Sequence, residues 1–443
     1  MKSFSIERLI LERPLLFSSI YLPKSGRILE NLLVGMHLAA LRSSANSLPV
    51  ALEELRNRKL KRLLSSAANL AFWKGKIPEN ILRTDNPITL MPLLPVITKA
   101  ELRLTNMDAR TQNSTAAIHG IFTGTSGSTG EPLQFFIDSR LGVRQWALLA
   151  RLAGLNVFRP ASLVHLWPTA NPNPLFGHTF FHAVTPESLA SQKLKIYAAL
   201  SQPGMILHSP PSLLRILLEF VNKDGIALRP LRIVTSSEAL LPQLSSRLKE
   251  VFQCPVISYY GSRELSVMAG GCESGRFHEN SEDIIIEAVS GNGVTLKRGE
   301  TGRLVMTGLN SFISPFIRYY TGDHGFLYPD LCPCGNPFTS FGFEGRMHET
   351  VAILLPNGEH IFPHNLTGIF NKRFNKILQY QVDHHAPYAF RILIVPSALY
   401  NQTDEEEIVR EFVAITHGTA ELRCVSSIKS QGPKVLPYIK SWF

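Results

Sequence analysis

Apolar positions recur with helical spacing over the first 110 residues, and short β-rich runs replace them from about Ile121. Between residues 52 and 67 the apolar positions are Leu52, Leu55, Leu60, Leu63, Leu64 and Ala67. They repeat every three or four residues, which is the period of one helix face. Proline-punctuated connections such as DNPITLMPLLPVITK (85–99) separate these stretches. The pattern predicts a mostly helical start over residues 1–110.

The middle of the chain alternates apolar runs with helical patterns. Residues 231–237 and 255–261 predict buried strands that run into loops, while residues 212–221 and 241–252 have helical periodicity. The apolar runs 282–289 and 302–309 are joined by a glycine-containing connection and predict antiparallel strands. Such alternation indicates layered α/β and α+β structure with mixed sheets, rather than one doubly wound sheet.

A domain boundary is expected near the segment FEGRMHET (343–350). After it, the apolar pattern predicts a strand, a helix, a strand, a helix and a strand, over residues 350–356, 364–374, 388–396, 405–416 and 422–428. We therefore expect a large multi-layer N-terminal domain over residues 1–345 and a small mobile α+β C-terminal domain over residues 346–443.

The distribution of charge does not alter the predicted fold, but it shows a basic surplus near the N-terminus. The formal net charge is +10, and residues 1–110 hold 17 Lys and Arg against 9 Asp and Glu. The densest basic piece is RNRKLKR (56–62). It suits an anionic partner such as a nucleic acid, a membrane surface or an acidic carrier protein, but it also suits the solvated face of a helix.

Neither a membrane span nor a disulfide framework is expected. The apolar segment 9–22 contains Glu12, Arg13 and Pro14 and is too short to cross a bilayer, although it leaves a peripheral membrane contact open. The chain has five cysteines, an odd number, so we expect a reducing, cytoplasmic location. The sequence is compatible with a monomer or a homodimer.

The loop IFTGTSGSTGEPLQF (121–135) is the first candidate site. Its glycines let backbone N–H groups converge on phosphate oxygens, and its Ser and Thr hydroxyls add donors. No glycine is followed by Lys and Ser or Thr at the spacing of a Walker A loop. In isolation, a loop of this composition is more often a plain surface turn than a phosphate-binding loop.

Three further motifs follow in order along the chain. SYYGSRELS (258–266) offers an aromatic at a strand end and the carboxylate of Glu264, which could stack on a base and hold Mg²⁺. RYYTGDHG (318–325) offers Asp323 as an acceptor for a ribose diol, and GFEGRMHE (342–349) places Arg346 at the expected domain boundary.

Together, and in this order, the four motifs resemble those of the adenylate-forming superfamily, which includes acyl-CoA synthetases, adenylation domains and luciferases. The sequence looks most like the phenylacetate–CoA ligase branch with its capsule-biosynthesis relatives, and the resemblance covers nearly the whole chain. It implies binding of ATP and Mg²⁺, with coenzyme A as the expected cosubstrate.

The resemblance also implies roles for individual residues. The residues that match the phosphate loop are Thr125, Ser126, Gly127, Ser128, Thr129 and Gly130. Ser236, Ser237 and Glu238 match the adenine-side loop, which is usually richer in glycine. Tyr260, followed by Gly261, matches the adenine-stacking aromatic, Glu264 the magnesium ligand and Asp323 the ribose-binding aspartate. Arg263 replaces the usual small residue before Glu264 and adds a cation.

The hinge and the catalytic lysine depart from the family pattern. Arg346 matches the arginine before the hinge, but His348 stands where an acid is common, with Glu349 next. Lys434, just after Gly432 and Pro433, fits the adenylation lysine best, and Lys429 and Lys440 are alternatives.

A zinc site is a separate expectation. Cys332 and Cys334 form a Cys-x-Cys knuckle, and Cys272 and His278 offer two more ligands of the types found in closed zinc sites. Branch relatives resemble this pattern and carry a structural zinc. The two pairs are far apart in the sequence, so four residues without a metal remain the alternative.

The implied activity is an ATP-dependent activation of a carboxylic acid to an acyl-adenylate with release of pyrophosphate, followed by acyl transfer to a thiol. Coenzyme A is the expected acceptor. An amine, or the thiol of a carrier protein in capsule or secondary-metabolite biosynthesis, would use the same first half. His208 and Trp167 are candidates for the acid pocket.

Two alternatives belong to another class. A zinc-containing nucleic-acid-binding protein would suit the basic charge, but the charge surplus and the Cys/His residues lie in different regions, and no recognition-helix pattern accompanies them. We therefore expect no nucleic acid partner. A catalytically silent interaction protein is disfavoured by the intact Glu264, Asp323 and Arg346.

Overall fold

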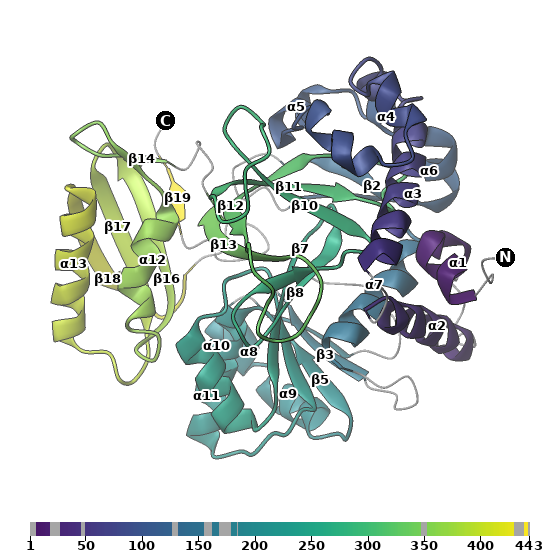
Figure 1. Ribbon diagram of the computed structural model, residues 1–443. Coiled ribbons are helices and arrows are strands. Elements are labelled where there is room, and N and C mark those ends of the chain that lie inside the picture. Colours follow the sequence, from purple (N-terminus) through teal and green to yellow (C-terminus); the bar gives the residue numbers. More distant parts are fainter. Residues whose placement is uncertain are drawn as a thin grey trace. The chain divides into compact units, whose positions relative to one another are not determined.

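The computed structural model describes residues 6–17, 27–45, 49–125, 132–154, 162–167, 179–183, 185–346, 352–428 and 438–441 (Figure 1). The chain divides into two compact units. Unit 1 comprises Met1–Gly127, Glu131–Pro160 and Tyr259–Glu344, and unit 2 comprises Ser128–Gly130, Ala161–Ser258 and Gly345–Phe443. The division breaks at Glu344, close to the expected boundary, but it groups the C-terminal segment with residues 161–258. The predicted division into domains 1–345 and 346–443 stays a prediction.

Unit 1 begins with helices, as the sequence predicts. Its helices are α1 (Ile6–Glu12), α2 (Arg27–Ala45), α3 (Pro49–Ala67), α4 (Glu79–Arg83), α5 (Lys99–Leu104), α6 (Asn113–His119) and α7 (Leu141–Leu152). Short 3₁₀ turns connect them at Pro14–Phe17, Ala71–Trp73, Pro87–Leu93 and Asp108–Arg110. Among the described residues, no helix is both long and apolar enough to cross a membrane.

Unit 1 contains a two-stranded hairpin and a larger sheet, with antiparallel pairing in both. A hairpin pairs β1 (Gly120–Gly124) with β2 (Gln134–Asp138). The larger sheet has the order β10-β11-β12-β13-β9-β8-β7. Its strands are β7 (Val256–Ser262), β8 (Ser266–Gly271), β9 (Phe277–Glu279), β10 (Ile284–Val289), β11 (Gly302–Gly308), β12 (Tyr319–Leu327) and β13 (Ser340–Arg346). The apolar stripe of α3, including Leu60 and Leu64, is fully buried in one core with Ile284–Ile286 and Leu304 of this sheet.

Unit 2 contains a parallel sheet that continues from the first half of β7, in the order β7-β6-β5-β3-β4. Its strands are β3 (Ser162–Trp167), β4 (Thr179–His182), β5 (Met205–His208) and β6 (Arg232–Thr235). The associated helices are α8 (Pro186–Ala190), α9 (Lys193–Leu200), α10 (Pro211–Asp224) and α11 (Pro242–Phe252). The amphipathic α10 buries Leu213, Leu214, Leu217 and Val221 in the local core.

Residues 352–428 and 438–441 of unit 2 form a four-stranded sheet, β18-β17-β16-β19, and a two-stranded hairpin, β14-β15. The elements are β14 (Ile353–Leu354), β15 (His360–Ile361), α12 (Pro363–Asn371), β16 (Ile377–Ala386), β17 (Ala389–Pro396), α13 (Gln402–Thr416), β18 (Thr419–Cys424) and β19 (Tyr438–Lys440). Helices α12 and α13 contact each other, and Phe370 and Phe412 enter the same core as Phe390.

The observed elements confirm the predicted mixture of α/β and α+β layers with mixed sheets. Two details differ. Strand β16 is absent from the prediction, and β18 begins and ends before the predicted 422–428. The predicted strand 350–356 is confined to Ile353–Leu354.

Candidate active site

Strands β7 and β12 bring Tyr260 and Asp323 together. The hydroxyl of Tyr260 donates to Oδ2 of Asp323 at 2.6 Å and lies 3.3 Å from the hydroxyl of Thr321. The rings of Phe341 and Phe343 lie 5.4 and 5.9 Å from the Tyr260 ring. Asp323 is buried. The strands therefore fix an aromatic face beside a carboxylate, as the proposed recognition of an adenosine needs.

Gly261 permits the turn after Tyr260. A Cβ atom at this position would lie 2.4 Å from the carbonyl oxygen of Ser266 on the neighbouring strand β8. The pairing register between β7 and β8 also shifts between Tyr260 and Gly261. Any larger residue here would push the two strands apart, so this glycine has a structural reason independent of a ligand.

Glu264 follows the end of β7 and is held by a residue from β12. The hydroxyl of Tyr319 donates to Oε1 of Glu264 at 2.9 Å, and the buried Tyr319 ring packs edge-on against Phe316. Sequence reasoning assigned no role to Tyr319, although it lies in the quoted segment 318–325. The doubled tyrosine before Gly322 was the available signal.

The β1–β2 hairpin carries the glycine-rich loop. The backbone N–H of Thr125 donates to the carbonyl of Leu133, and the N–H of Leu133 donates to the Thr125 hydroxyl, both at 3.0 Å. These bonds close the base of the loop. Of the predicted phosphate-loop residues only Thr125 is described, since Ser126, Gly127, Ser128, Thr129 and Gly130 lie outside the described residues.

Arg263 lies beside that hairpin. Its Nε donates to the hydroxyl of Thr123 at 3.1 Å, two residues before Thr125. The structure therefore places the side chain of Arg263 next to strand β1, which leads into the loop.

The predicted adenine-side loop belongs to unit 2. Ser236 is buried, and Ser237 has a left-handed φ of 72°, a conformation that favours glycine. The carboxylate of Glu238 accepts hydrogen bonds from the backbone N–H and the hydroxyl of Ser212, both at 2.9 Å. Glu238 thus caps the first turn of α10 and fixes the loop.

The hinge and lysine candidates are only partly described. Arg346 ends β13, but its side chain and residues 347–350 lie outside the described part of the chain. Lys429 and Lys434 lie outside it as well. The backbone of Lys440 pairs with His384 in β19, and its side chain is not described.

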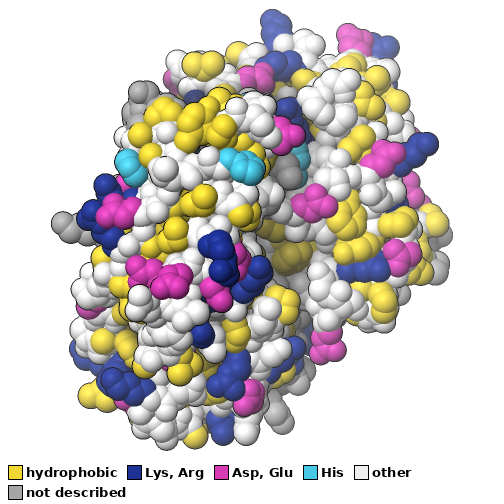
Figure 2. Space-filling model, turned by 90° about the vertical axis from the view of Figure 1, so that its left-hand side faces the viewer, with side chains coloured by type: hydrophobic (Ala, Val, Ile, Leu, Met, Phe, Trp, Pro, Cys, Tyr) yellow, Lys and Arg dark blue, Asp and Glu magenta, His cyan; other side chains and the backbone are white. Residues whose placement is uncertain are grey.

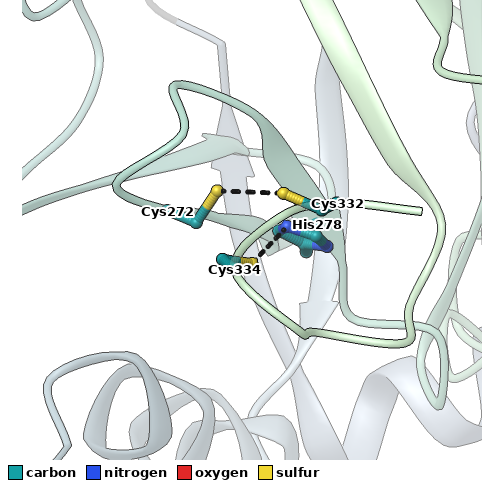
Figure 3. A group of neighbouring side chains, drawn as sticks. All are labelled: Cys272, His278, Cys332 and Cys334. Carbon is teal, nitrogen blue, oxygen red and sulfur yellow. Dashed lines mark hydrogen bonds between the residues drawn. The ribbon is translucent and has the colours of Figure 1, made fainter. Parts of the chain in front are cut away.

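Cys272, His278, Cys332 and Cys334 converge in unit 1, with ligand atoms all within 4.8 Å of one another (Figure 3). The sulfur atoms of Cys272 and Cys332 are 3.6 Å apart, and the Cys334 sulfur lies 3.3 Å from Nε2 of His278. Three thiols and one imidazole nitrogen at this spacing fit a tetrahedral zinc ion.

The surroundings of the cluster favour metal binding. Nδ1 of His278 lies 3.2 Å from the carbonyl oxygen of Phe338, which accepts the Nδ1 proton and leaves Nε2 as a ligand. Burial opposes ionisation of Cys332, but hydrogen bonds from Cys334, His278 and Cys272 outweigh it and lower the Cys332 pKa to about 6. A thiolate is the form that binds zinc.

The basic segment 56–62 is largely used inside unit 1. Arg56 forms an ion pair with Glu279 at 3.0 Å, and the buried Lys59 binds Asp283 at 2.8 Å. Arg144 also binds Asp283, at 2.7 Å. Burial alone would raise the pKa of Asp283, but the two cations outweigh it and hold the pKa well below its usual range. This segment is therefore more than a solvated helix face.

Two histidines meet at the carboxyl ends of β3 and β5. Their Nδ1 atoms, on His165 and His208, are 3.0 Å apart, and the Trp167 ring lies 4.8 Å from the His208 ring. Burial lowers the His165 pKa to about 4, which keeps this imidazole neutral at pH 7. Strands β3 and β5 are neighbours in the sheet. The strand that follows β3 in the chain, β4, lies on one side of this pair, and the strand that follows β5, β6, lies on the other. Ligands of parallel sheets bind at such a switch point.

Comparison with known proteins adds to this geometry. No protein-family model matches the chain. Over 361 residues the chain is 22% identical to a phenylacetate-coenzyme A ligase from Thermus thermophilus, covering 75% of this chain and 78% of that protein.

Solved structures of 2-hydroxyisobutyryl-CoA ligase are similar in fold. The complex with 2-HIB-AMP in the postadenylation state has a TM-score of 0.66 at 19% identity and covers 88% of this chain and 89% of that one. The complex with 2-HIB-AMP and CoA in the thioesterification state has a TM-score of 0.57 at 19% identity, covering 89% and 91%. The expected resemblance is confirmed: the chain has the fold of the adenylate-forming ligases and resembles their phenylacetate–CoA ligase branch in sequence.

Proposed function

We propose that the chain is an AMP-forming acid–thiol ligase. It activates a carboxylic acid with ATP, giving an acyl-adenylate and pyrophosphate, and then transfers the acyl group to a thiol. The observation that carries the proposal is the arrangement in unit 1 of Tyr260, Asp323 and Glu264, held by specific hydrogen bonds, in a fold that the adenylate-forming ligases share.

In the first half-reaction, an oxygen of the acid attacks the α-phosphorus of ATP, and the bond to pyrophosphate breaks. The Tyr260 ring stacks on adenine and the Asp323 carboxylate accepts from the ribose hydroxyls. Loop 125–130 donates to the outer phosphates, helped by Arg263. Catalysis rests on positioning and charge neutralisation, so no covalent protein intermediate is needed.

The carboxylate of Glu264 fits the chemistry of a magnesium ligand. Its Oε1 accepts a hydrogen bond from the Tyr319 hydroxyl, which orients the carboxylate, and no ion pair to Glu264 is found among the described residues. When bound, Mg²⁺ would offset negative charge on the phosphate oxygens. Glu264 would contribute one ligand oxygen, and the rest of the coordination would come from ATP and water.

Lys434 is proposed as the lysine that bridges the acid and the nucleotide, with Lys429 and Lys440 as alternatives. Arg346 is proposed to mark the start of a hinge over residues 346–349. Rotation of a C-terminal domain 346–443 about that hinge would exchange the first half-reaction for the second. These assignments rest on the family pattern alone.

The acid pocket is proposed at the switch point between β3 and β5. His165 and His208 there share a hydrogen bond, and Trp167 supplies an aromatic wall. Two imidazoles beside an indole suit an acid with a flat or hydroxylated side chain better than a long alkyl chain.

Coenzyme A is the proposed acceptor. The 2-hydroxyisobutyryl-CoA ligase of similar fold has been solved with CoA and an acyl-adenylate, and the Thermus protein is named a coenzyme A ligase. An amine or a carrier-protein thiol, in capsule or secondary-metabolite biosynthesis, would require the same first half-reaction and is the alternative.

A structural zinc ion is proposed at Cys272, His278, Cys332 and Cys334, because these side chains supply the number, type and spacing of ligands that a closed site needs. We further propose that the protein acts in the cytoplasm as a monomer or a homodimer. The five cysteines, which form no disulfide among themselves, are consistent with a reducing compartment.

The nucleic-acid-binding alternative is weaker. Much of segment 56–62 is engaged in internal ion pairs, at Arg56 and Lys59 among others. On the face in Figure 2, the described Lys and Arg side chains are interspersed with Asp and Glu and form no continuous basic patch. Binding to phosphate backbones needs such a patch.

The deciding experiment is an acid-dependent adenylation screen, in which hydroxylamine traps the acyl-adenylate of each acid in a broad panel. CoA and amine acceptors then compete for the activated acid. We expect one class of acid to give hydroxamate and CoA to take the acyl group. If no acid supports either hydroxamate formation or pyrophosphate exchange into ATP, the protein is a catalytically silent relative.

A further inference from the structure

A cavity of about 250 Å³ lies within unit 2, beside helices α10 and α11 (labelled in Figure 1). Its polar lining consists of Arg215, Glu219, Asn222, Arg247 and Asn375. Helix α10 also contacts strand β16, so residues of two segments distant in sequence close around this space. The residues proposed above for catalysis do not line it.

Arg215 is the unusual member of this lining. Its Nε is buried and has no hydrogen-bond partner among the described residues. Burial lowers the pKa of Arg215, and Tyr380, Glu238 and Glu219 oppose this only through space, without a hydrogen bond to it in the described part of the chain. Arg215 as a whole is half-buried, but a buried N–H donor without a partner costs free energy. Arg215 lines the cavity, so a ligand bound there could supply the missing hydrogen-bond acceptor.

The remaining charges leave the cavity with a basic character. Arg247 forms an ion pair with Glu250 at 2.6 Å, and its side chain is 44% exposed. Glu219 is the acidic lining residue, so the charged side chains that line the cavity are two arginines and one glutamate. The amides of Asn222 and Asn375 are neutral hydrogen-bonding groups that can donate to an anion.

We propose that this cavity binds a phosphate group, with the Arg215 guanidinium as its principal ligand. The planar fork of donors on arginine matches two phosphate oxygens at once. A volume of about 250 Å³ accommodates a phosphate group with several waters, since each water occupies about 30 Å³ in the liquid. Residues 125–130 are not among the lining residues, and phosphate binding here can be measured without any acid being adenylated.

The phosphate group that this cavity binds could be free phosphate or the 3′-phosphate of CoA. Inorganic phosphate is the first probe, because both ligands present the same phosphate oxygens. Isothermal titration is performed without Mg²⁺ on the full chain, on Arg215→Met and on Arg215→Lys, each in an Arg263→Ala background that removes the cation proposed to help hold phosphate at the ATP site. The control is Arg423→Met, an exposed arginine of unit 2 paired with Glu421 at 2.7 Å. Near-ultraviolet circular dichroism checks that each variant is folded.

We expect Arg215→Met to weaken phosphate binding by about tenfold or more, as loss of a charged hydrogen-bond donor implies, and Arg423→Met to leave it unchanged. Arg215→Lys should fall between them, because it keeps the charge but loses the fork. Equal phosphate affinity in the parent and Arg215→Met, or no phosphate binding by the parent, would overturn the proposal.

CoA and 3′-dephospho-CoA separate the two sources. If the site serves the 3′-phosphate of CoA, Arg215→Met weakens CoA binding to the level of dephospho-CoA. If it serves free phosphate, Arg215→Met weakens phosphate binding and leaves the affinity for both forms of CoA unchanged. Either result supports the site, and neither depends on whether any acid is adenylated.

Discussion

The hydroxyl of Tyr260 donates a 2.6 Å hydrogen bond to Oδ2 of Asp323, which joins the proposed adenine-stacking ring to the proposed ribose acceptor. Tyr260→Phe keeps the ring and removes this bond. Because a hydrogen bond to a charged group contributes about 1.5–3 kcal/mol, we expect the KM for ATP to rise about tenfold, with a smaller change in kcat. Pyrophosphate exchange at varied ATP concentration measures both.

Tyr320→Phe is the matched control. The hydroxyl of Tyr320 lies 3.1 Å from Nε2 of His324, on the same strand as Asp323, and has no proposed role in ATP binding. We expect a normal KM for ATP in this variant. If Tyr260→Phe also has a normal KM, Asp323 does not need the tyrosine for nucleotide recognition.

Glu264 supplies the second prediction. Glu264→Ala should reduce adenylate formation by roughly 100-fold or more while leaving the fold intact, because it removes a metal ligand at the phosphates. Tyr319→Phe removes only the bond to Oε1, so its smaller loss should recover as Mg²⁺ is raised. Single-turnover assays over a Mg²⁺ series test both, and near-normal turnover of Glu264→Ala would refute the metal role.

The amphipathic elements of this fold were predictable, whereas strand β16 was not. Helix α10 was visible because Leu213, Leu214 and Leu217 lie on one apolar face. Strand β16 lies between β17 and β19, but Gln379 and Gln381 are buried in it with exposures of 5% and 4%. Amide side chains on the inner face conceal the alternation that identifies a strand.

The boundaries of β18 were mispredicted for a related reason. Its side chains are mostly exposed, and it lies at the edge of its sheet. A strand that buries little leaves a weak apolar signal, and backbone pairing with β17 then decides where it ends.

The candidate site was likewise predictable only in part. The positions of Tyr260, Glu264 and Asp323 were readable from ordered motifs, because each motif is a short contiguous stretch. The contacts between them were not, since Tyr319 reaches Glu264 only through the folding of β12 near the end of β7. Likewise, the sequence motif identified Glu238 as part of the adenine-side loop. It could not show that both carboxylate oxygens of Glu238 accept hydrogen bonds from Ser212.

The third prediction concerns the proposed adenylation lysine. Lys434→Ala should slow adenylate formation roughly 100-fold, because a cation that offsets charge near the α-phosphate is removed. It should spare thioester formation from a supplied acyl-adenylate. Lys429→Ala and Lys440→Ala are the matched controls and should retain both activities. Equal loss of both half-reactions in Lys434→Ala would indicate a folding defect, and loss confined to a control would reassign the role.

The fourth prediction concerns the Cys/His cluster. Metal analysis should give about one zinc per chain, and Cys332→Ser or Cys334→Ser should lose it. Because the ligands join β8, β9 and the segment before β13, metal loss should also lower the melting temperature of unit 1. Cys424→Ser is the control, since this exposed cysteine is not part of the cluster. Full zinc content in Cys332→Ser would exclude the proposed ligand set.

The last prediction concerns pH. Burial lowers the His165 pKa from its ordinary 6.5 to about 4, so between these values the folded state binds fewer protons at this residue than the unfolded state. The free energy of unfolding must therefore rise with pH in that window, and the stability is lost as pH falls below 6.5. For a partly buried group we expect about 1–3 kcal/mol at this site.

His165→Gln removes the titration and keeps a polar side chain next to His208. Urea unfolding at pH 7.0, 6.0, 5.0 and 4.5 should therefore show a steeper loss of stability in the parent than in His165→Gln. Other groups titrate in both proteins, so only the difference between them reports on His165. The control His182→Gln changes an exposed histidine at the end of β4 and should lose stability as the parent does. Identical pH profiles for the parent and His165→Gln would mean that His165 titrates alike in the folded and unfolded chain.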